Sequence, residues 1–381
     1  MLYTIENGLD TQEREVIGLI EEVRKTLNYA LSSPGRWFGL LRRSTLAKAI
    51  QGSNSIEGYN VSAEDALAAV DGLGPIDATG MDWAAVTGYR KAMTYVLQLA
   101  NDPHFSFNEG FLRSLHFMML DYDLSRNPGR WRPGPIFVRD EQKGITVYDG
   151  PDAPQVPSLI AELIKSLNNR NDHPVMIRAA LGHLNLVMIH PFSDGNGRMA
   201  RCLQTLILAR EGILAPQFSS IEEYLGKNTQ EYYAVLAETG QGEWNPRNNP
   251  KPWLRFCLTA HYRQAMTLLR RSKETVRIWD QLEVETKNRG LSERCIPSLM
   301  DAAYGYTVRN SSYRAHTNIS ELSASRDLKQ LVVSGLLEAH GDRRGRTYRP
   351  APTLRAIRDA AREPKRRDDP FAGGTLSLPW S

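Results

Sequence analysis

Cysteine is scarce in this sequence of 381 residues, which contains only Cys202, Cys257 and Cys295. The three lie far apart, and no two of them form a C-x-x-C pair. Because disulfide frameworks and zinc sites both need patterned cysteines, we expect neither. Unpaired cysteines fit the reducing cytosol, so we expect a cytoplasmic protein.

Long apolar runs are missing too. No stretch approaches the ~20 apolar residues that a membrane-spanning helix needs, and residues 1–16 lack the basic region and apolar core of a signal peptide. We therefore expect no membrane partner. The apolar share of 41% and the charged share of 24% are ordinary for a folded protein with a sizeable core.

Positive side chains barely outnumber negative ones, because the net charge is only +4. The excess is unevenly placed, because residues 271–381 hold 20 Lys and Arg against 14 Asp and Glu. A basic carboxyl-terminal part suggests an acidic partner such as nucleic acid, and a solvated basic surface explains it equally well.

Helical periodicity dominates what is present, with apolar residues repeatedly three and four apart. The pattern changes near 270–285, where short helices and then a basic hairpin follow. We therefore predict a mainly α fold divided into 1–80, 81–270 and 271–355, with a disordered charged tail at 356–381. The predicted helices are 13–31, 46–56, 63–70, 82–100, 109–120, 157–168, 175–188, 199–211 and 252–270.

Two short β-prone runs interrupt this pattern, at Ile136–Val138 and Ile145–Tyr148, with a polar turn between them. Such an arrangement predicts a β-hairpin. Because an isolated hairpin is only marginally stable, we expect it to lie on the helical body with one strand edge exposed.

The segment His190–Arg201, with the sequence HPFSDGNGRMAR, lies between two predicted helices. Gly195 and Gly197 allow backbone N–H groups to approach a ligand closely, and the helix that follows offers its amino terminus to an anion. Arg198 and Arg201 are three residues apart and share one helical face, which suits a polyphosphate.

Two further residues of this segment carry chemistry. Asp194 supplies a single carboxylate, which suits Mg²⁺ when phosphates complete the coordination shell. His190 has an ordinary pKa of about 6.5 and can act as a general base. Each residue alone has a structural explanation, as a helix cap, an Asx turn or a surface arginine, and only the combination indicates a nucleotide site.

The segment resembles the signature loop of the Fic family, H-P-F-x-D/E-G-N-G/K-R-x-x-R, at every constrained position. The resemblance implies a helical Fic core at 81–270, preceded by a Fic-associated segment at 1–80. It also implies a protein adenylyltransferase, which moves AMP from ATP to a Ser, Thr or Tyr hydroxyl of a target protein and releases pyrophosphate.

The resemblance further implies roles for single residues. His190 would deprotonate the target hydroxyl, and Phe192 would anchor the loop in the core. The others would hold Mg²⁺ and ATP: Asp194 the metal ion, Gly195, Asn196 and Gly197 the phosphates, Arg198 the developing charge, and Arg201 the γ-phosphate.

A second motif, Ser53-Asn54-Ser55-Ile56-Glu57-Gly58, lies upstream. Glu57 falls in the last turn of a predicted helix, where the helix dipole disfavours a carboxylate, and Gly58 fits the carboxyl cap. The segment resembles the inhibitory motif S/T-x-x-x-E-G/N of the same family. The resemblance implies that Glu57 pairs with Arg201 and denies the γ-phosphate its partner; a surface glutamate is the alternative.

The hairpin occupies the place of the Fic flap, which binds the target segment as an added strand. This implies target docking by Ile136, Phe137 and Val138, whereas a hairpin that only covers the core is the alternative.

Residues 271–355 resemble a winged helix, with 323–337 as its recognition helix and the following turn. Ser325, Arg326 and Lys329 would then face a DNA groove, and Arg344 would lie on the wing near phosphates. Winged helices also bind proteins, so the partner of this unit stays open.

We therefore predict a mainly α protein with a Fic-type core, a β-hairpin flap and a small winged-helix domain. Its predicted function is autoinhibited protein adenylylation with ATP and Mg²⁺. The alternatives are an ATP-sensing DNA-binding regulator with little turnover, an enzyme that mainly removes AMP, and an enzyme with another nucleotide donor. The target, the oligomeric state (a homodimer included) and whether Glu57 acts within its own chain stay open.

Overall fold

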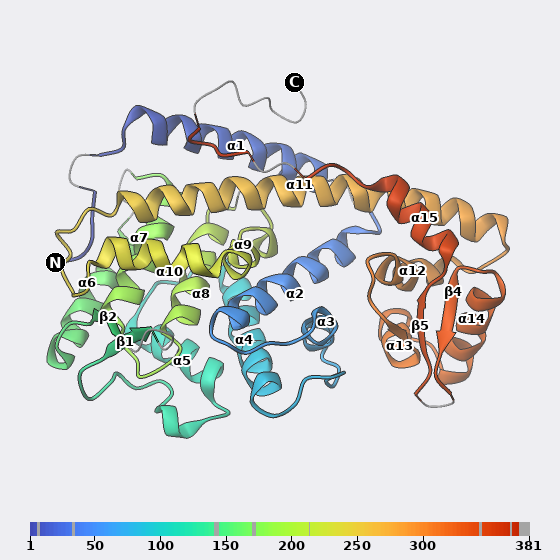
Figure 1. The fold of residues 1–381 in the computed structure, drawn as a ribbon, viewed down its shortest axis with the longest axis horizontal. Helices are drawn as coiled ribbons and strands as arrows, with labels where there is room; N and C mark the ends of the chain where they lie inside the picture. The colour runs from blue at the N-terminus through green and yellow to red at the C-terminus, as the bar shows by residue number, and fades with distance from the viewer. Residues whose placement is uncertain are drawn as a thin grey trace.

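The protein is mainly helical, as the sequence predicts, and carries two small antiparallel sheets. The computed structural model describes residues 1–5, 8–32, 35–140, 145–169, 173–212, 214–342, 345–365 and 368–372. The molecule is elongated, and one long helix, α11, runs along most of its length (Figure 1). No helix within the described residues is long and apolar enough to cross a membrane.

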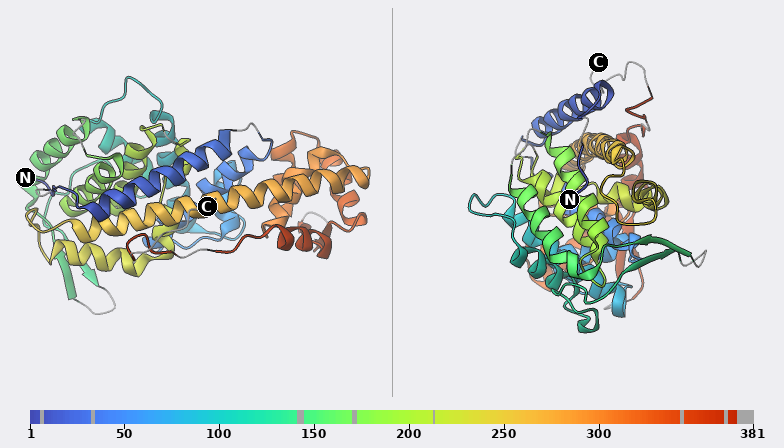
Figure 2. Two further views of the ribbon diagram at one scale, coloured as in Figure 1. Left: turned by 90° about the horizontal axis from the view of Figure 1, so that it is seen from above. Right: turned by 90° about the vertical axis from the view of Figure 1, so that its left-hand side faces the viewer.

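The larger part of the molecule holds the first eleven helices, and α1 lies beside α11 on one face (Figure 2). Their bounds are α1 (Thr11–Ser32), α2 (Phe38–Ile56), α3 (Ala63–Asp71), α4 (Gly80–Leu99), α5 (Glu109–Leu120), α6 (Val156–Asn168), α7 (Val175–Ile189), α8 (Asn196–Ala209), α9 (Glu222–Lys227), α10 (Thr229–Gly240) and α11 (Lys251–Asn288). The hairpin strands β1 (Phe137–Asp140) and β2 (Ile145–Asp149) confirm the predicted pair, and the turn at 141–144 lies outside the described residues.

Local sequence signals set several helix ends. The side chain of Ser62 caps α3 by accepting from the Asp65 amide, and Asn108 caps α5 by accepting from the Phe111 amide. Gly58 has a φ of +83° directly after α2, as expected for a residue that ends a helix in the left-handed region.

Helix α2 packs against α9 at unusually close range. A Cβ atom on Gly52 would lie 2.5 Å from the carbonyl oxygen of Glu222, and one on Gly226 would lie 2.5 Å from the Cα of Gly52. Only glycine at both positions lets the two backbones approach this closely. This contact fixes the position of α2, which carries the Ser53–Gly58 motif.

The described residues of the carboxyl-terminal unit form helices and then a hairpin, as the sequence predicts, and a further helix, α15, follows the hairpin where none was predicted. Its sheet has the strand order β3-β5-β4 and is antiparallel. The elements are α12 (Ile296–Ala303), β3 (Val308–Arg309), α13 (Asn310–Thr317), α14 (Glu321–Val333), β4 (Leu337–His340), β5 (Thr347–Pro350) and α15 (Pro352–Ala361).

Helix α11 overturns the expected break between the two parts. The sequence predicts a helix that ends at 270 and a boundary at 270–285, but α11 continues without interruption to Asn288. Leu268, Ile278 and Leu282 of α11 are buried in a second apolar core, together with Leu27 and Leu31 of α1. The two parts therefore share one helix, and no flexible linker joins them.

The expected disorder at 356–381 is wrong for residues 356–365 and 368–372. Helix α15 extends to Ala361, whose side chain is buried with Leu354 in the second core. Beyond it, the backbone oxygen of Phe371 accepts from Gln12 Nε2 at 2.9 Å, and the Arg255 guanidinium lies 5.2 Å from the Phe371 ring. The charged composition concealed these few apolar anchors, and 373–381 lie outside the described residues.

Candidate active site

The loop from His190 to Gly195 joins the carboxyl end of α7 to the amino end of α8. His190 and Gly195 both have a positive φ, of +51° and +76°, so the chain reverses tightly between the two helices. The first helical bond of this turn runs from the Met199 amide to the Gly195 oxygen, at 2.9 Å. The amides of residues 196–198 therefore have no helical partner and form a positive helix end that favours anions.

Phe192 anchors this loop, as the sequence predicts. Its side chain is fully buried, stacks on the His116 ring at 3.7 Å between centroids, and lies 4.8 Å from the Trp131 ring. The loop is thereby fixed to α5, and the anion-binding amides are held in place before any ligand arrives.

The side chain of Asn196 is held within the loop. Its Oδ1 accepts from the Phe192 amide at 2.9 Å, and its Nδ2 donates to the Phe192 oxygen at 2.8 Å. Both polar atoms of the side chain are thus used within the loop. Asn196 shapes the turn, and only its backbone amide is available to a phosphate.

We expect Phe192→Ala to lower the free energy of unfolding by about 3–5 kcal/mol, because a fully buried aromatic ring is removed from a packed site. Urea denaturation followed by circular dichroism measures the change. Phe117→Ala is the matched control, since that ring is 48% exposed, and its effect should stay below about 1 kcal/mol. Equal effects of the two substitutions would contradict the anchoring role.

Two residues that the sequence analysis missed hold the loop from outside. His116 of α5 accepts from the Gly129 amide with Nδ1 at 2.8 Å, so its Nε2 carries the proton and donates to the Asp194 oxygen at 2.9 Å. Arg132 is buried, and its Nε donates to the His190 oxygen at 2.8 Å while its backbone amide donates to the Pro191 oxygen at 2.9 Å. Neither residue lies in a recognisable motif, so spacing alone could not have found them.

His190 is held as a neutral imidazole with one free nitrogen. Its Nδ1 lies 3.1 Å from the Val187 oxygen, and because a carbonyl can only accept, the proton is on Nδ1. Burial lowers the pKa of His190 to about 4, so the ring is uncharged at neutral pH. The unprotonated Nε2 is therefore ready to take a proton.

Arg198 and Arg201 bring unsatisfied donors to the same site. Both side chains are buried, yet Nε and Nη2 of Arg198 and Nη1 of Arg201 have no hydrogen-bond partner within the described residues. The Arg198 guanidinium instead lies 5.1 Å from the ring of Tyr59. Buried guanidinium donors are normally paired, so this arrangement fits an anion with several acceptor oxygens.

Asp194 is the one carboxylate of the loop. Its Oδ2 lies 3.2 Å from Arg126 Nη1 and 3.7 Å from Arg198 Nη2. No group of three or more His, Cys, Asp or Glu side chains with metal-binding geometry occurs among the residues that the structure describes. A lone carboxylate beside an anion site fits Mg²⁺ only in the mode in which the phosphates of a bound nucleotide supply most of the oxygen ligands.

The upstream motif contacts Arg201 as the sequence predicts. Glu57 Oε1 accepts from Arg201 Nη2 at 2.6 Å, and Ser53 accepts from the same guanidinium through its hydroxyl at 2.7 Å and its backbone oxygen at 3.0 Å. Burial opposes ionisation of Glu57, but the charges of Arg201 and Arg198 outweigh it and hold the pKa of its carboxyl below the ordinary value. Glu57 is therefore an anion in direct contact with the helix end.

Gly197 makes this contact possible. A Cβ atom on Gly197 would lie 2.5 Å from Glu57 Oε1 and 3.0 Å from Arg201 Nη1. Glu57 thus lies directly over the first turn of α8, where a phosphate would approach the amides.

The hairpin lies beside the loop with one free edge. Tyr148 of β2 donates its hydroxyl to the Met188 oxygen of α7 at 2.8 Å, which ties the hairpin to the helix that ends at His190. The edge of β2 that faces away from β1 is hydrogen-bonded at Asp149, because the Asp149 amide donates to the Gly242 oxygen and the Asp149 oxygen accepts from the Trp244 amide. The outer edge of β1 pairs with no other strand of the described chain, and Phe137 on it is 50% exposed.

The residues predicted to contact DNA lie far from this loop in the sequence, on α14. Ser325, Arg326 and Lys329 are all exposed, and Ser325 Oγ accepts from Asn310 Nδ2 at 3.0 Å. Arg344 lies outside the described residues. DNA binding by this helix stays a prediction.

This geometry defines a class: a helical domain in which a neutral histidine and two buried arginines surround the anion-binding end of a helix. Residues 106–208 match the family model described as Fic/DOC family, a range that lies within the predicted core and contains the whole loop. Residues 106–208 of the chain are therefore similar to the Fic/DOC family.

Named relatives agree with this assignment. The chain is 28% identical over 247 residues to "Protein adenylyltransferase Fic" from Nematostella vectensis, covering 61% of this chain and 52% of that protein. It is 37% identical over 106 residues to "Protein adenylyltransferase fic-1" from Caenorhabditis elegans, covering 26% of this chain and 20% of that protein. The chain thus spans about half the length of the first relative and a fifth of the second.

Solved structures share the fold. A Fic family protein from Desulfovibrio desulfuricans G20 aligns with a TM-score of 0.59 at 22% identity, over 92% of this chain and 99% of that one. Fic-1 from Caenorhabditis elegans aligns with a TM-score of 0.54 at 21% identity, over 68% and 72% of the two chains. The architecture that surrounds the loop is therefore that of Fic proteins.

Proposed function

We propose that the protein transfers AMP from ATP to a Ser, Thr or Tyr hydroxyl of a target protein, and that Glu57 restrains this activity. The observation that carries the proposal is the free Nε2 of a neutral His190 beside a helix end with unpaired arginine donors. The two relatives named as protein adenylyltransferases support it.

The site favours attack on the α-phosphorus of a bound ATP. The target oxygen forms a bond to that phosphorus, its proton passes to His190 Nε2, and the bond from phosphorus to the bridging oxygen breaks to release pyrophosphate. The amides of residues 196–198 and the two arginines stabilise charge on the phosphate oxygens, which is the main task of a protein in this class of transfer. Asp194 would hold Mg²⁺, which neutralises phosphate charge when it is bound.

The free edge of β1 supplies a means of positioning the target. A peptide segment added to this edge would form main-chain hydrogen bonds that do not depend on its side chains, as in other strand-addition complexes. Tyr148 ties the hairpin to α7, so such a segment would be held close to His190. Positioning of the hydroxyl in this way contributes directly to the rate.

Glu57 competes with the nucleotide for Arg201. Its carboxylate already occupies Nη2, so a γ-phosphate would have to displace an ion pair of 2.6 Å. An ATP molecule bound beside Glu57 would therefore be misplaced for transfer. An enzyme that mainly removes AMP remains the second candidate, because the same carboxylate could orient a water molecule.

The position of a radioactive label in ATP tests the proposal. We expect Glu57→Gly protein added to a lysate to increase the covalent label of target proteins, relative to the lysate alone, with ATP labelled at the α-phosphate and not with ATP labelled at the γ-phosphate, because AMP is transferred and pyrophosphate leaves. A gel reports both results. Label from the γ-phosphate instead would indicate a kinase, and reversible binding without covalent label would favour the nucleotide-sensing regulator.

The alternative function, an ATP-sensing DNA-binding regulator, is tested by the salt dependence of DNA binding. Arg326 and Lys329 are exposed cations on α14, so a steep loss of DNA binding with rising salt would support it.

A further inference from the structure

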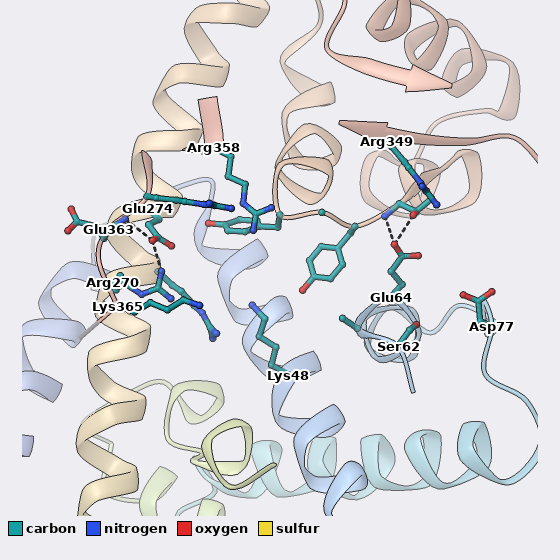
Figure 3. Close-up of a pocket in the computed structure, with 17 residues that line it drawn as sticks. Lys48, Ser62, Glu64, Asp77, Arg270, Glu274, Arg349, Arg358, Glu363 and Lys365 are labelled. Carbon is teal, nitrogen blue, oxygen red and sulfur yellow. Dashed lines mark hydrogen bonds and ion pairs between the residues drawn. The ribbon is translucent and has the colours of Figure 1, made fainter. Parts of the chain in front are cut away.

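A second cavity, of about 800 Å³, lies between α2, α3, α11 and the carboxyl-terminal unit (Figure 3). It shares no residue with the His190 loop. Its lining carries seven lysine or arginine side chains against four carboxylates. Lys48 points into this space from α2, with Lys365 on one side and Glu64 on the other (Figure 3).

The cations of this cavity fall into two groups. Three are paired with carboxylates: Arg270 with Glu274 at 2.5 Å, Arg271 with Glu223 at 2.6 Å and Arg362 with Asp359 at 3.3 Å. The side chains of the other four form no hydrogen bond or ion pair with the side chains or backbone of the described residues; they are Lys48, Arg349, Arg358 and Lys365. Unpaired cations from α2, β5, α15 and the segment after α15 thus meet around one space.

Lys48 lies in surroundings that disfavour the charged form of its amine. Its side chain is only partly exposed, and burial together with the charge of Arg271 lowers the pKa of its ammonium to about 7. Glu223 opposes this shift, whereas Lys227 and Arg270 add to it. A half-buried amine among cations is stabilised in its charged form by an anion placed beside it.

We propose that this cavity binds a small ligand with two or more phosphate groups, held by Lys48 and Arg358. Cations on opposite walls suit several separated phosphates better than one carboxylate, because a single carboxylate would reach only one wall. The volume lies within the roughly 300–1,000 Å³ of small-molecule sites. Tyr304 and Tyr306 also line the space and offer ring surfaces to a ligand that carries a base.

The site would join two parts of the molecule. Lys48 belongs to α2, and Arg358 belongs to α15, so an occupant would bridge the helix of the Ser53–Gly58 motif and the carboxyl-terminal unit. This inference does not depend on AMP transfer, since binding alone defines it.

Calorimetric titration of the full chain with inorganic tripolyphosphate tests the site. We expect the Lys48→Met, Arg358→Met double variant to lose one class of binding site, or to bind there at least tenfold more weakly, because both charge-assisted contacts are removed. Lys273→Met, an exposed lysine of α11 outside the cavity, is the matched control and should bind as the unmodified protein does. A parallel titration with ATP shows whether a nucleoside adds affinity at this site or the phosphates suffice.

Hydrogen exchange on the unmodified chain gives a second test that needs no variant. Tripolyphosphate should slow exchange in residues 45–52 and 304–307, in addition to any effect at 190–201. Protection confined to 190–201, or equal affinity of the double variant and the Lys273→Met control, would overturn the proposal.

Discussion

Replacing His190 with alanine in Glu57→Gly protein should lower the rate of AMP transfer by about 10²- to 10⁴-fold, the usual contribution of a general base. The reason is specific to this site. The only free ring nitrogen of His190 is unprotonated, and its Nδ1 is held by the Val187 oxygen, so the ring is oriented before the target arrives. The measurement is incorporation of α-phosphate label with time, at saturating ATP.

The control for this prediction is nucleotide binding. The phosphate contacts come from the amides of 196–198 and from Arg198 and Arg201, none of which the substitution removes. ATP affinity of His190→Ala should therefore stay within a few fold of that of its parent. Undiminished transfer by the double variant would exclude His190 as the base, whereas loss of both transfer and binding would point to collapse of the loop.

Substituting Glu57 with glycine should raise AMP transfer by roughly 10- to 100-fold, because one charge-assisted hydrogen bond of about 1.5–3 kcal/mol no longer competes for Arg201. Initial rates of labelling for the two proteins at equal ATP measure the effect. Glu57→Gln is the informative companion, since it keeps the size of the side chain and removes its charge. The labelling rate of Glu57→Gln protein should lie between the rates of the unmodified protein and of Glu57→Gly protein.

The same variant distinguishes restraint from the reverse reaction. If Glu57 orients a water that removes AMP, Glu57→Gly protein would accumulate label because removal stops. Adding unmodified protein to an already labelled target separates the cases, since only an enzyme that removes AMP releases the label. Equal labelling rates for unmodified and Glu57→Gly protein would eliminate the inhibitory role.

The candidate site could be proposed from the sequence because its residues are contiguous. His190, Asp194, Arg198 and Arg201 lie within twelve residues, and the spacing of the two arginines on α8 already places them on one face. Glu57 was also predictable, because a carboxylate at a helix carboxyl end needs a partner. The structure supplies that partner at 2.6 Å.

The rest could not be predicted because it depends on contacts between distant segments. His116 and Arg132 hold the loop from positions 78 and 58 residues away, measured to Asp194 and His190. The sequence also cannot show that both polar atoms of the Asn196 side chain bond to the backbone of Phe192. The continuation of α11 from 270 to Asn288 was missed for a similar reason, since a polar surface on a long helix resembles the end of that helix.

Continuity of α11 has a consequence for any attempt to dissect the protein. A chain cut at 270 would lose Ile278, Trp279 and Leu282, and it would leave Leu268 and Leu269 of α11 and Leu27 and Leu31 of α1 facing water. Such a fragment would expose apolar side chains to water and would be prone to aggregate. The two parts of the molecule share this helix: at about 1.5 Å per residue, α11 is a rod of roughly 57 Å that extends from the helices around the His190 loop to the carboxyl-terminal unit.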